Sequence, residues 1–245
     1  MSMNFAIDEG ALVKNLSAQF PDGCPVCGGR KFSFRPVLWP ELIDQWQLSL
    51  DESRYTDIQQ GFHCDRCQCN LRSMTLAKAI CRAQGHSGTL DEWIESSGSI
   101  HLLEINEAGG LTTHLRKLPN YKFVCYPETD IHALPYADSH FDLVVHSDTL
   151  EHVEQPIHAL NECRRVLKPQ GRLAYTVPVI VQRMSRGRHG LPASYHGAPA
   201  ENKEDYRVHT EFGADAWTFL MEAGFRRVTI ISIVYPASVA FIADC

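Results

Sequence analysis

Two C-x-x-C pairs are the clearest chemical feature of this 245-residue sequence: Cys24 with Cys27, and Cys64 with Cys67. A C-x-x-C turn presents two thiolates to one ion, and two such turns complete a tetrahedral shell of four sulfurs, which suits Zn²⁺. Four protein ligands leave no position open, so we expect a structural zinc ion that holds this segment together. Free cysteines or a redox pair are the alternatives, but the thioredoxin-like pattern of a redox pair is absent.

Two neighbours of the second pair, His63 and Cys69, are possible substitute ligands; the plainer interpretation is a surface histidine and a spare thiol. The nine cysteines are an odd number, and the first residues lack a basic region followed by an apolar stretch. Reduced thiols and a cytoplasmic location are therefore expected. No apolar run reaches the roughly 18 residues that a membrane span needs, so we expect no membrane association.

Three histidines are candidate general bases, because histidine titrates near neutral pH. They are His152 in LEHV, His196 in SYHGAP and His209 in VHTEF. A structural role for His152 at the start of a helix is an equally good interpretation. Segment 180–210 is rich in glycine, proline and polar residues, and we expect it to cover the substrate. The same segment contains a basic cluster: Arg183, Arg186, Arg188 and His189. This cluster could bind a substrate anion or could belong to a solvated loop, and the sequence favours neither.

The elements that must position these residues fall into two parts. Residues 1–95 are predicted to form a small zinc-binding module with linker helices. Within it, Leu42, Trp46 and Leu50 recur at helical spacing. A second helix is expected over 73–85, with Gly85 as its C-cap, and Thr89 is expected to cap a short third helix.

Residues 96–245 alternate between strand and helix patterns. We expect strands at 99–105, 121–126, 141–147 and 172–179, helices at 111–118, 156–171 and 214–225, and a terminal pair of strands. This alternation predicts an α/β domain with a doubly wound, mainly parallel sheet. The first strand ends in an acidic residue and a glycine-containing turn, HLLEINEAGG, which is the geometry of a nucleotide-binding βα turn.

The sequence after this turn contains motifs that are more specific to one family. DIHALPYADSHFDLVVHSDTLEHV (130–153), HALNECRRVLKPQGRLAYTVP (158–178) and a late helix ending in AGF resemble the class I S-adenosylmethionine-dependent methyltransferases. The resemblance covers about residues 100–245. It implies a methyltransferase-type sheet, S-adenosylmethionine as cofactor, and in-line transfer of a methyl group to an aligned nucleophile.

The resemblance also implies roles for individual residues. Glu104 would lie near the methionine amino group, and Asp130 would accept a hydrogen bond from the adenine amino group. The others implied to surround the cofactor are Asn106, Ala108, Gly109, Gly110, Ile131, Ser147, Asp148 and Leu150. Asn106 replaces a glycine, and asparagine tolerates a left-handed backbone.

Two departures from the family pattern bear on this site. The acidic residue that usually ends the second strand is replaced by Cys125, with Glu128 three residues later as the only substitute. Only residues 126–129 separate this strand from Asp130, where the family usually has a helix and a strand. We therefore predict that the sheet lacks that strand.

Three hypotheses about function remain, and the net charge distinguishes the first two. The net charge is −6, and residues 1–95 hold 9 Lys and Arg against 12 Asp and Glu. Because nucleic-acid binders usually carry a basic face, we expect a methyltransferase acting on a small-molecule or sugar-containing substrate. An RNA methyltransferase that grips RNA with the zinc module is the second hypothesis. A zinc-stapled scaffold with a degenerate cofactor loop is the third. The sequence does not specify the oligomeric state.

Overall fold

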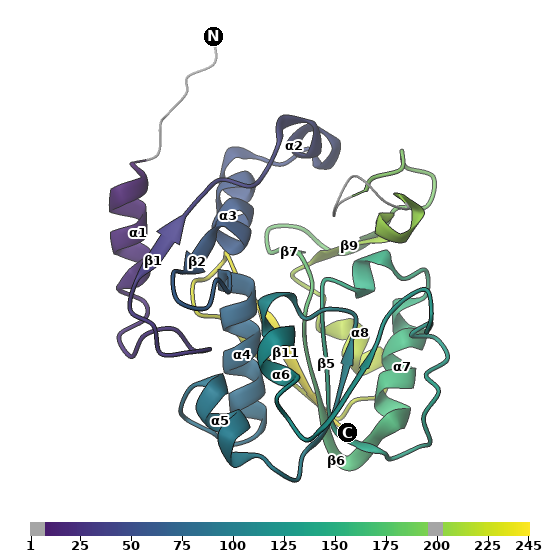
Figure 1. Cartoon of the computed structure of the whole chain (residues 1–245). Helices are drawn as coiled ribbons and strands as arrows, with labels where there is room; N and C mark the ends of the chain where they lie inside the picture. The colour runs from purple at the N-terminus through teal and green to yellow at the C-terminus, as the bar shows by residue number, and fades with distance from the viewer. Residues whose placement is uncertain (1–7, 196–202) are drawn as a thin grey trace.

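The structure is a computed structural model that describes residues 8–195 and 203–245 (Figure 1). Its centre is a six-stranded sheet in the order β10-β11-β6-β5-β3-β4. β4, β3, β5 and β6 run parallel to one another, and β11 is antiparallel to both of its neighbours. The bounds are β3 His101–Ile105, β4 Asn120–Val124, β5 Phe141–Ser147, β6 Leu167–Thr176, β10 Arg227–Ile231 and β11 Ala240–Asp244. The predicted α/β fold with a mainly parallel sheet is therefore confirmed.

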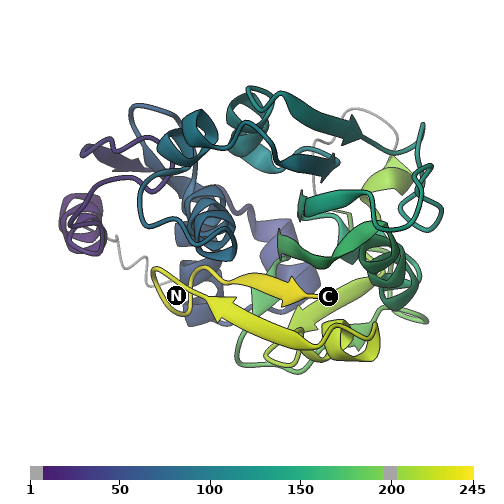
Figure 2. The ribbon, with the colours of Figure 1, turned by 90° about the horizontal axis from the view of Figure 1, so that it is seen from below.

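Both faces of the sheet are covered, because successive strand residues point to opposite sides. Leu102 packs in one core with the helices α4 (Leu71–Ala83) and α5 (Leu90–Ser96). Leu103 packs in the other core with α7 (Pro156–Val166) and α8 (Thr218–Glu222). Figures 1 and 2 show the sheet between these two layers. The near-continuous burial of β3 and β5 matches strands that are covered on both faces.

The predicted loss of one strand is confirmed. β4 is at the edge of the six-stranded sheet and pairs only with β3 among the described strands. The chain then passes through turns from Cys125 to His140 and enters β5 without forming a further strand. The edge of the sheet beyond β4 is therefore bordered by irregular chain and not by a further strand.

The N-terminal part is built from short elements around the cysteines: α1 Glu9–Ser17, β1 Phe32–Phe34, α2 Pro40–Trp46, α3 Leu50–Gly61 and β2 Phe62–Cys64. β1 and β2 form an antiparallel pair. Three aromatic rings, those of Phe20, Phe32 and Phe62, pack on one another with centroids 5.0–5.7 Å apart. These rings belong to the larger apolar core that also contains Leu16, Val26 and Ile58.

Several predicted bounds were wrong in informative ways. The helix expected to reach residue 171 ends at Val166, because Leu167 already pairs with Phe141 at the start of β6. The helix expected at 111–118 is reduced to a 3₁₀ turn, η1 (Gly109–Leu111), and α6 (Thr112–Leu115). Leu50 is 74% exposed and begins α3 after a break, so it does not continue the buried face of Leu42 and Trp46. Thr89 caps α5 as predicted, whereas the C-cap of α4 is Gln84 and Gly85, with φ 69°, directly follows it.

A second, three-stranded sheet lies beside the carboxyl ends of the central strands (Figure 1). Its strands are β7 Val179–Ile180, β8 Arg186–Gly187 and β9 Thr210–Gly213; η2 (Leu150–His152) and η3 (Lys203–Tyr206) are the remaining 3₁₀ turns. No helix in the described ranges has the length and apolar character needed to cross a membrane.

Candidate cofactor and metal sites

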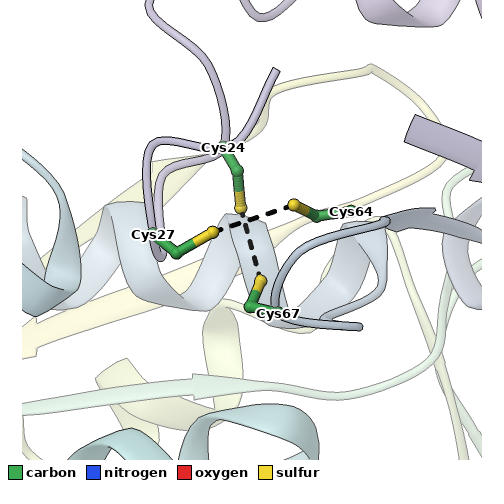
Figure 3. A group of neighbouring side chains, drawn as sticks. All are labelled: Cys24, Cys27, Cys64 and Cys67. Carbon is green, nitrogen blue, oxygen red and sulfur yellow. Dashed lines mark hydrogen bonds between the residues drawn. The ribbon is translucent and has the colours of Figure 1, made fainter. Parts of the chain in front are cut away.

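The four cysteines of the two C-x-x-C pairs converge on one point (Figure 3). Their sulfur atoms all lie within 4.8 Å of one another. The Sγ–Sγ distance is 3.7 Å between Cys24 and Cys67 and 3.8 Å between Cys27 and Cys64. A tetrahedral zinc ion with bonds of about 2.3 Å requires sulfurs about 3.8 Å apart. The donor set and its spacing therefore fit a closed four-thiolate zinc centre.

The backbone around this centre is shaped for metal-binding turns. Gly28 has φ +75°, and a Cβ on Gly29 would lie 2.9 Å from Cys64 Sγ. The amide of Gly28 donates to the carbonyl of Cys24, and that of Gln68 donates to Cys64, so both pairs form the same kind of turn. In the described part of the chain, neither His63 nor Cys69 joins the four-cysteine group.

A cavity of about 850 Å³ opens at the carboxyl ends of β3, β4 and β5. This is the edge at which parallel α/β sheets bind ligands. Of the residues that the family resemblance implied, five line it: Asn106, Asp130, Ile131, Ser147 and Asp148. Six do not: Glu104, Ala108, Gly109, Gly110, Glu128 and Leu150.

Glu104 is fully buried and holds the loop that follows β3. Its Oε1 accepts hydrogen bonds from the Ala108 amide (2.7 Å) and the Thr112 hydroxyl (2.5 Å). Its Oε2 accepts one from the Tyr121 hydroxyl at 2.6 Å. Both carboxylate oxygens are thus engaged by the protein, and the residue fixes the loop from behind.

Asn106 connects three strand ends. It adopts the expected left-handed backbone, with φ 55°. Its Oδ1 accepts a hydrogen bond from the Tyr126 amide (3.0 Å), and its Nδ2 donates to the Thr149 hydroxyl (3.3 Å). The side chain therefore ties the loops after β4 and β5 to the loop after β3, which a glycine here would not do.

Gly109 and Gly110 of the loop face residues of the N-terminal part (residues 1–95, called the cysteine module below) and not the cavity. A Cβ on Gly109 would lie 2.9 Å from Ser73 Oγ, and one on Gly110 would lie 2.8 Å from Cys69 Sγ. Gly109 also has φ +57°, which disfavours a side chain. The glycines are thus required by close packing against the start of α4 and against Cys69, two residues before it.

Asp130 presents a carboxylate at the rim of the cavity. Its Oδ1 accepts a hydrogen bond from the His132 amide (2.9 Å) and contacts the His132 ring Nδ1 at 2.7 Å. Partial burial opposes ionisation, but these hydrogen bonds outweigh it and hold the pKa of Asp130 below its usual value. Nearby, the Cys125 thiol donates to the exposed Glu128 carboxylate at 3.4 Å. Cys125 itself lines the cavity.

A second cavity of about 480 Å³ adjoins the first. It is lined by residues of α2 and α3 on one side and of β7 on the other. The two cavities share five lining residues: Glu107, Ser147, Asp148, His152 and Tyr206. They are therefore continuous at the loop after β5, where a reacting group from each could meet.

The three candidate bases are placed differently. His152 lines both cavities, and its Nδ1 donates to the Arg207 carbonyl at 3.0 Å. Burial lowers the pKa of His152 despite this hydrogen bond, so the ring is neutral at physiological pH. His209 lines only the larger cavity, and burial lowers its pKa as well. His196 lies outside the described residues.

An ion pair stands at the junction of the cavities. Arg72, from α4, pairs with Asp148, which has φ +45°. Burial lowers the pKa of Arg72 to about 10. Glu151 is buried nearby, and burial raises its pKa to about 8 although Arg72 acts in the opposite direction. The sequence analysis did not identify Arg72 or Glu107 as lining residues. Arg72 belongs to α4, which lies outside the family motifs.

The arginines of the cluster at 183–188 are engaged within the protein. The guanidinium of Arg183 pairs with Glu52 at 2.7 Å and donates to the carbonyls of Trp46 and Gln47. Arg186 and Arg188 both pair with Glu211. Arg183 therefore connects the N-terminal helices to the segment that follows β7. The three arginines form ion pairs within the protein, so they fit neither a substrate-anion site nor a solvated loop.

Residues 85–175 match the family model described as methyltransferase domain. The matched segment begins after α4, ends within β6, and contains four of the five residues shared by the two cavities, all except Tyr206. It leaves out the cysteine module.

Two curated proteins are similar in sequence. One is the ubiquinone/menaquinone biosynthesis C-methyltransferase UbiE of Yersinia enterocolitica, 30% identical over 154 residues, with 56% of this chain and 60% of that protein covered. The other is an uncharacterized 37.1 kDa protein in a transposon of Streptomyces fradiae, 35% identical over 92 residues, with 37% of this chain and 26% of that protein covered. The chain thus spans less than two thirds of either relative.

Among solved structures, a Thermotoga maritima protein is similar in arrangement. It is described as an S-adenosylmethionine-dependent methyltransferase and possible histamine N-methyltransferase. The identity is 12%, the TM-score is 0.40, and the match covers 71% of this chain and 89% of that one.

Proposed function

We propose that this protein transfers a methyl group from S-adenosylmethionine to a small-molecule acceptor. The observation that carries the proposal is the meeting of two cavities at Ser147, Asp148 and His152. A methyltransferase needs one pocket for the cofactor, one for the acceptor, and a common wall where the sulfonium methyl and the nucleophile approach in line. The match to the methyltransferase domain model supports this assignment.

The larger cavity is the proposed cofactor site. Asp130 would accept a hydrogen bond from the adenine amino group through Oδ2, since Oδ1 is already engaged by His132. Ile131 would lie against the ring, and Asn106 would shape the loop beneath the cofactor. Bound there, S-adenosylmethionine would supply an electrophilic methyl group. The sequence-based role of Glu104 is revised in this proposal, because its carboxylate holds the loop and not the amino acid end of the cofactor.

His152 is the proposed general base for an acceptor that must lose a proton. It lies at the wall shared by the two cavities, and its depressed pKa keeps it neutral and able to accept a proton. His209 remains an alternative on the cofactor side.

The four cysteines are proposed to hold a structural zinc ion. The sulfur spacing supports a closed shell, so the metal would take no part in the methyl transfer. The division into a module of residues 1–95 and a domain of residues 96–245 also remains a proposal. α4 belongs by sequence to the first part and packs on β6 and β11 of the second.

The alternatives receive less support. RNA binding would need a basic surface, yet Arg183 and Arg188 are internally paired and the module is acidic by sequence. A non-enzymatic scaffold would have its hollow filled by its own side chains, whereas the cavity at Asp130 has about 850 Å³ of open volume. The relative that acts in quinone biosynthesis carries out C-methylation, so carbon as well as oxygen acceptors belong in any screen.

Calorimetric titration of the full chain with S-adenosylhomocysteine tests the proposal. We expect one site per chain with micromolar affinity. No heat of binding at millimolar ligand would remove the enzymatic assignment and leave the scaffold. If the ligand binds, a crystal structure of that complex should show it beside Asp130 and Asp148.

A further inference from the structure

The 480 Å³ cavity has apolar walls that come from two distant parts of the chain. The cysteine module contributes the first wall, which includes Trp39, Leu42 and Trp46 of the segment leading into and forming α2. The strand β7 contributes the opposite wall through Val179 and Ile180. A pocket lined in this way binds its ligand mainly through apolar contact and aromatic stacking.

The charged residues of this cavity argue against a polyanionic ligand. Arg72 is the one cation in its described lining, and it is already paired with Asp148. Glu107 adds a second carboxylate. Phosphates need unpaired arginine or lysine side chains or helix N-termini. A nucleotide sugar or an RNA strand would therefore meet more negative than positive charge here.

Three polar atoms of the lining residues are buried and have no hydrogen-bond partner in the described part of the chain. They are the Tyr55 hydroxyl, Arg72 Nε and Asp148 Oδ1. Tyr55 is 6% exposed. A buried polar atom without a partner costs about 1–3 kcal/mol. Donors and acceptors are both present in this group, which a neutral hydroxyl is able to satisfy because it donates and accepts.

One aromatic residue of the wall is open to solvent. Trp39 is 40% exposed and lines the cavity, so part of its ring is accessible to a ligand. It lies at the N-cap of α2, where it makes no capping hydrogen bond through its side chain. A flat ligand entering the cavity would cover this ring.

We infer that the acceptor is an uncharged, hydroxylated aromatic molecule, held between the cysteine module and β7 with its hydroxyl at Tyr55 and the Arg72–Asp148 pair. This rests on the proposed function, since it names the acceptor class of the same site. It also assigns a role to the module: α2 and α3 determine which acceptor reaches the cofactor.

Equilibrium dialysis of the full chain against 2-naphthol, with saturating S-adenosylhomocysteine, tests the inference. We expect a dissociation constant of about 100 µM or lower for such a compact aromatic probe. Trp39→Ala is expected to weaken binding about fivefold or more, because the stacking surface is lost. Tyr55→Phe is expected to weaken it severalfold without loss of ring packing. Naphthalene, which lacks the hydroxyl, is expected to bind about tenfold more weakly than 2-naphthol.

Trp217→Ala is the matched control, because Trp217 is 42% exposed and lines neither cavity. Equal weakening by Trp39→Ala and Trp217→Ala, or tighter binding of uridine diphosphate glucose than of 2-naphthol, overturns the inference. S-adenosylhomocysteine affinity, measured separately on each variant, isolates the proposed function. Binding of S-adenosylhomocysteine without binding of 2-naphthol would support methyl transfer and contradict the aromatic acceptor. Binding of 2-naphthol without binding of S-adenosylhomocysteine would support the aromatic ligand and contradict methyl transfer.

Discussion

Gly110 of the loop after β3 lies directly against Cys69 of the cysteine module, so closely that a Cβ on the glycine would be 2.8 Å from the Cys69 sulfur. The neighbouring Gly109 approaches Ser73 in the same way. The loop proposed to carry the cofactor is therefore packed between Glu104 on one side and the module on the other. The shape of the cofactor cavity depends on both.

The first prediction concerns this packing. Gly110→Ala should destabilise the protein by about 1–3 kcal/mol, because the new methyl group displaces Cys69 or the loop. For a chain of this size that corresponds to a fall in Tm of about 2–4 °C per kcal/mol. Thermal unfolding measures it, and calorimetry should show weaker S-adenosylhomocysteine binding. Gly98→Ala, where a Cβ meets nothing within 4 Å, is the control and should be close to neutral.

The second prediction concerns the metal. Mass spectrometry of the native protein should find one zinc ion per chain, and a chelator should lower Tm by removing it. Cys64→Ser should abolish stoichiometric zinc. Cys245→Ser, at a terminal cysteine outside the four-sulfur group, should leave zinc content unchanged. Full zinc content in Cys64→Ser would contradict the four-thiolate centre.

The third prediction concerns Asp130. Asp130→Asn should weaken S-adenosylhomocysteine binding about tenfold, because a hydrogen bond to a charged acceptor contributes about 1.5–3 kcal/mol. Calorimetry measures the change, and circular dichroism verifies the fold. Glu95→Gln, an exposed carboxylate outside both cavities, is the control. An unchanged dissociation constant in Asp130→Asn would place the adenine elsewhere.

The fourth prediction concerns acid stability. His146 is fully buried in β5, stacked on Tyr175, and burial lowers its pKa from 6.5 to about 3. The unfolded chain therefore binds a proton that the folded chain does not, and the free energy of unfolding falls as pH drops from about 6.5 towards 3. The slope from this one group approaches about 1.4 kcal/mol per pH unit.

His146→Phe keeps the ring stack and removes the titration. Urea unfolding at a series of pH values should show a flatter acid limb for this variant than for the native protein. His189→Gln, at an exposed histidine, should leave the slope as it is. Equal slopes in all three proteins would show that His146 does not govern the acid limb.

The fifth prediction concerns the clamp between Arg183 and Glu52. Arg183→Met should cost about 2 kcal/mol, because Glu52 is 4% exposed and would lose its charged partner. Arg183 lowers the pKa of Glu52 to about 2, so the stability from this pair is present above pH 4.5 and is lost as pH falls towards 2. Arg227→Met, which breaks an exposed pair with Asp244, should cost far less.

The sequence was informative where local patterns decide the structure. Strand–helix alternation predicted the sheet, the short interval between Cys125 and Asp130 predicted the absent strand, and the paired cysteines predicted the four-sulfur group. Thr89 was recognised as a cap, and Gly85 was placed one residue from the true C-cap, because helix ends depend on neighbouring backbone groups.

The remainder depends on contacts between distant segments. Gly109 and Gly110 resemble a cofactor cradle in sequence, but their close neighbours, Ser73 and Cys69, lie 36 and 41 positions earlier. Arg183 resembles an anion-binding residue until its partner Glu52 is known. The end of α7 at Val166 is set by pairing of Leu167 with Phe141, which overrides a helical pattern. No local signal carries such information.

The helix α4 has a consequence for how the chain can be divided. It begins two residues after Cys69 and carries Arg72 into the cavity junction. It packs on β6 and β11, with Ala79 and Ala83 against Ala240 and Ile242 of β11. Removing the first 95 residues would strip one apolar face of the central sheet as well as the cysteines. A fragment that begins at residue 96 would expose this apolar face to solvent and is expected to aggregate.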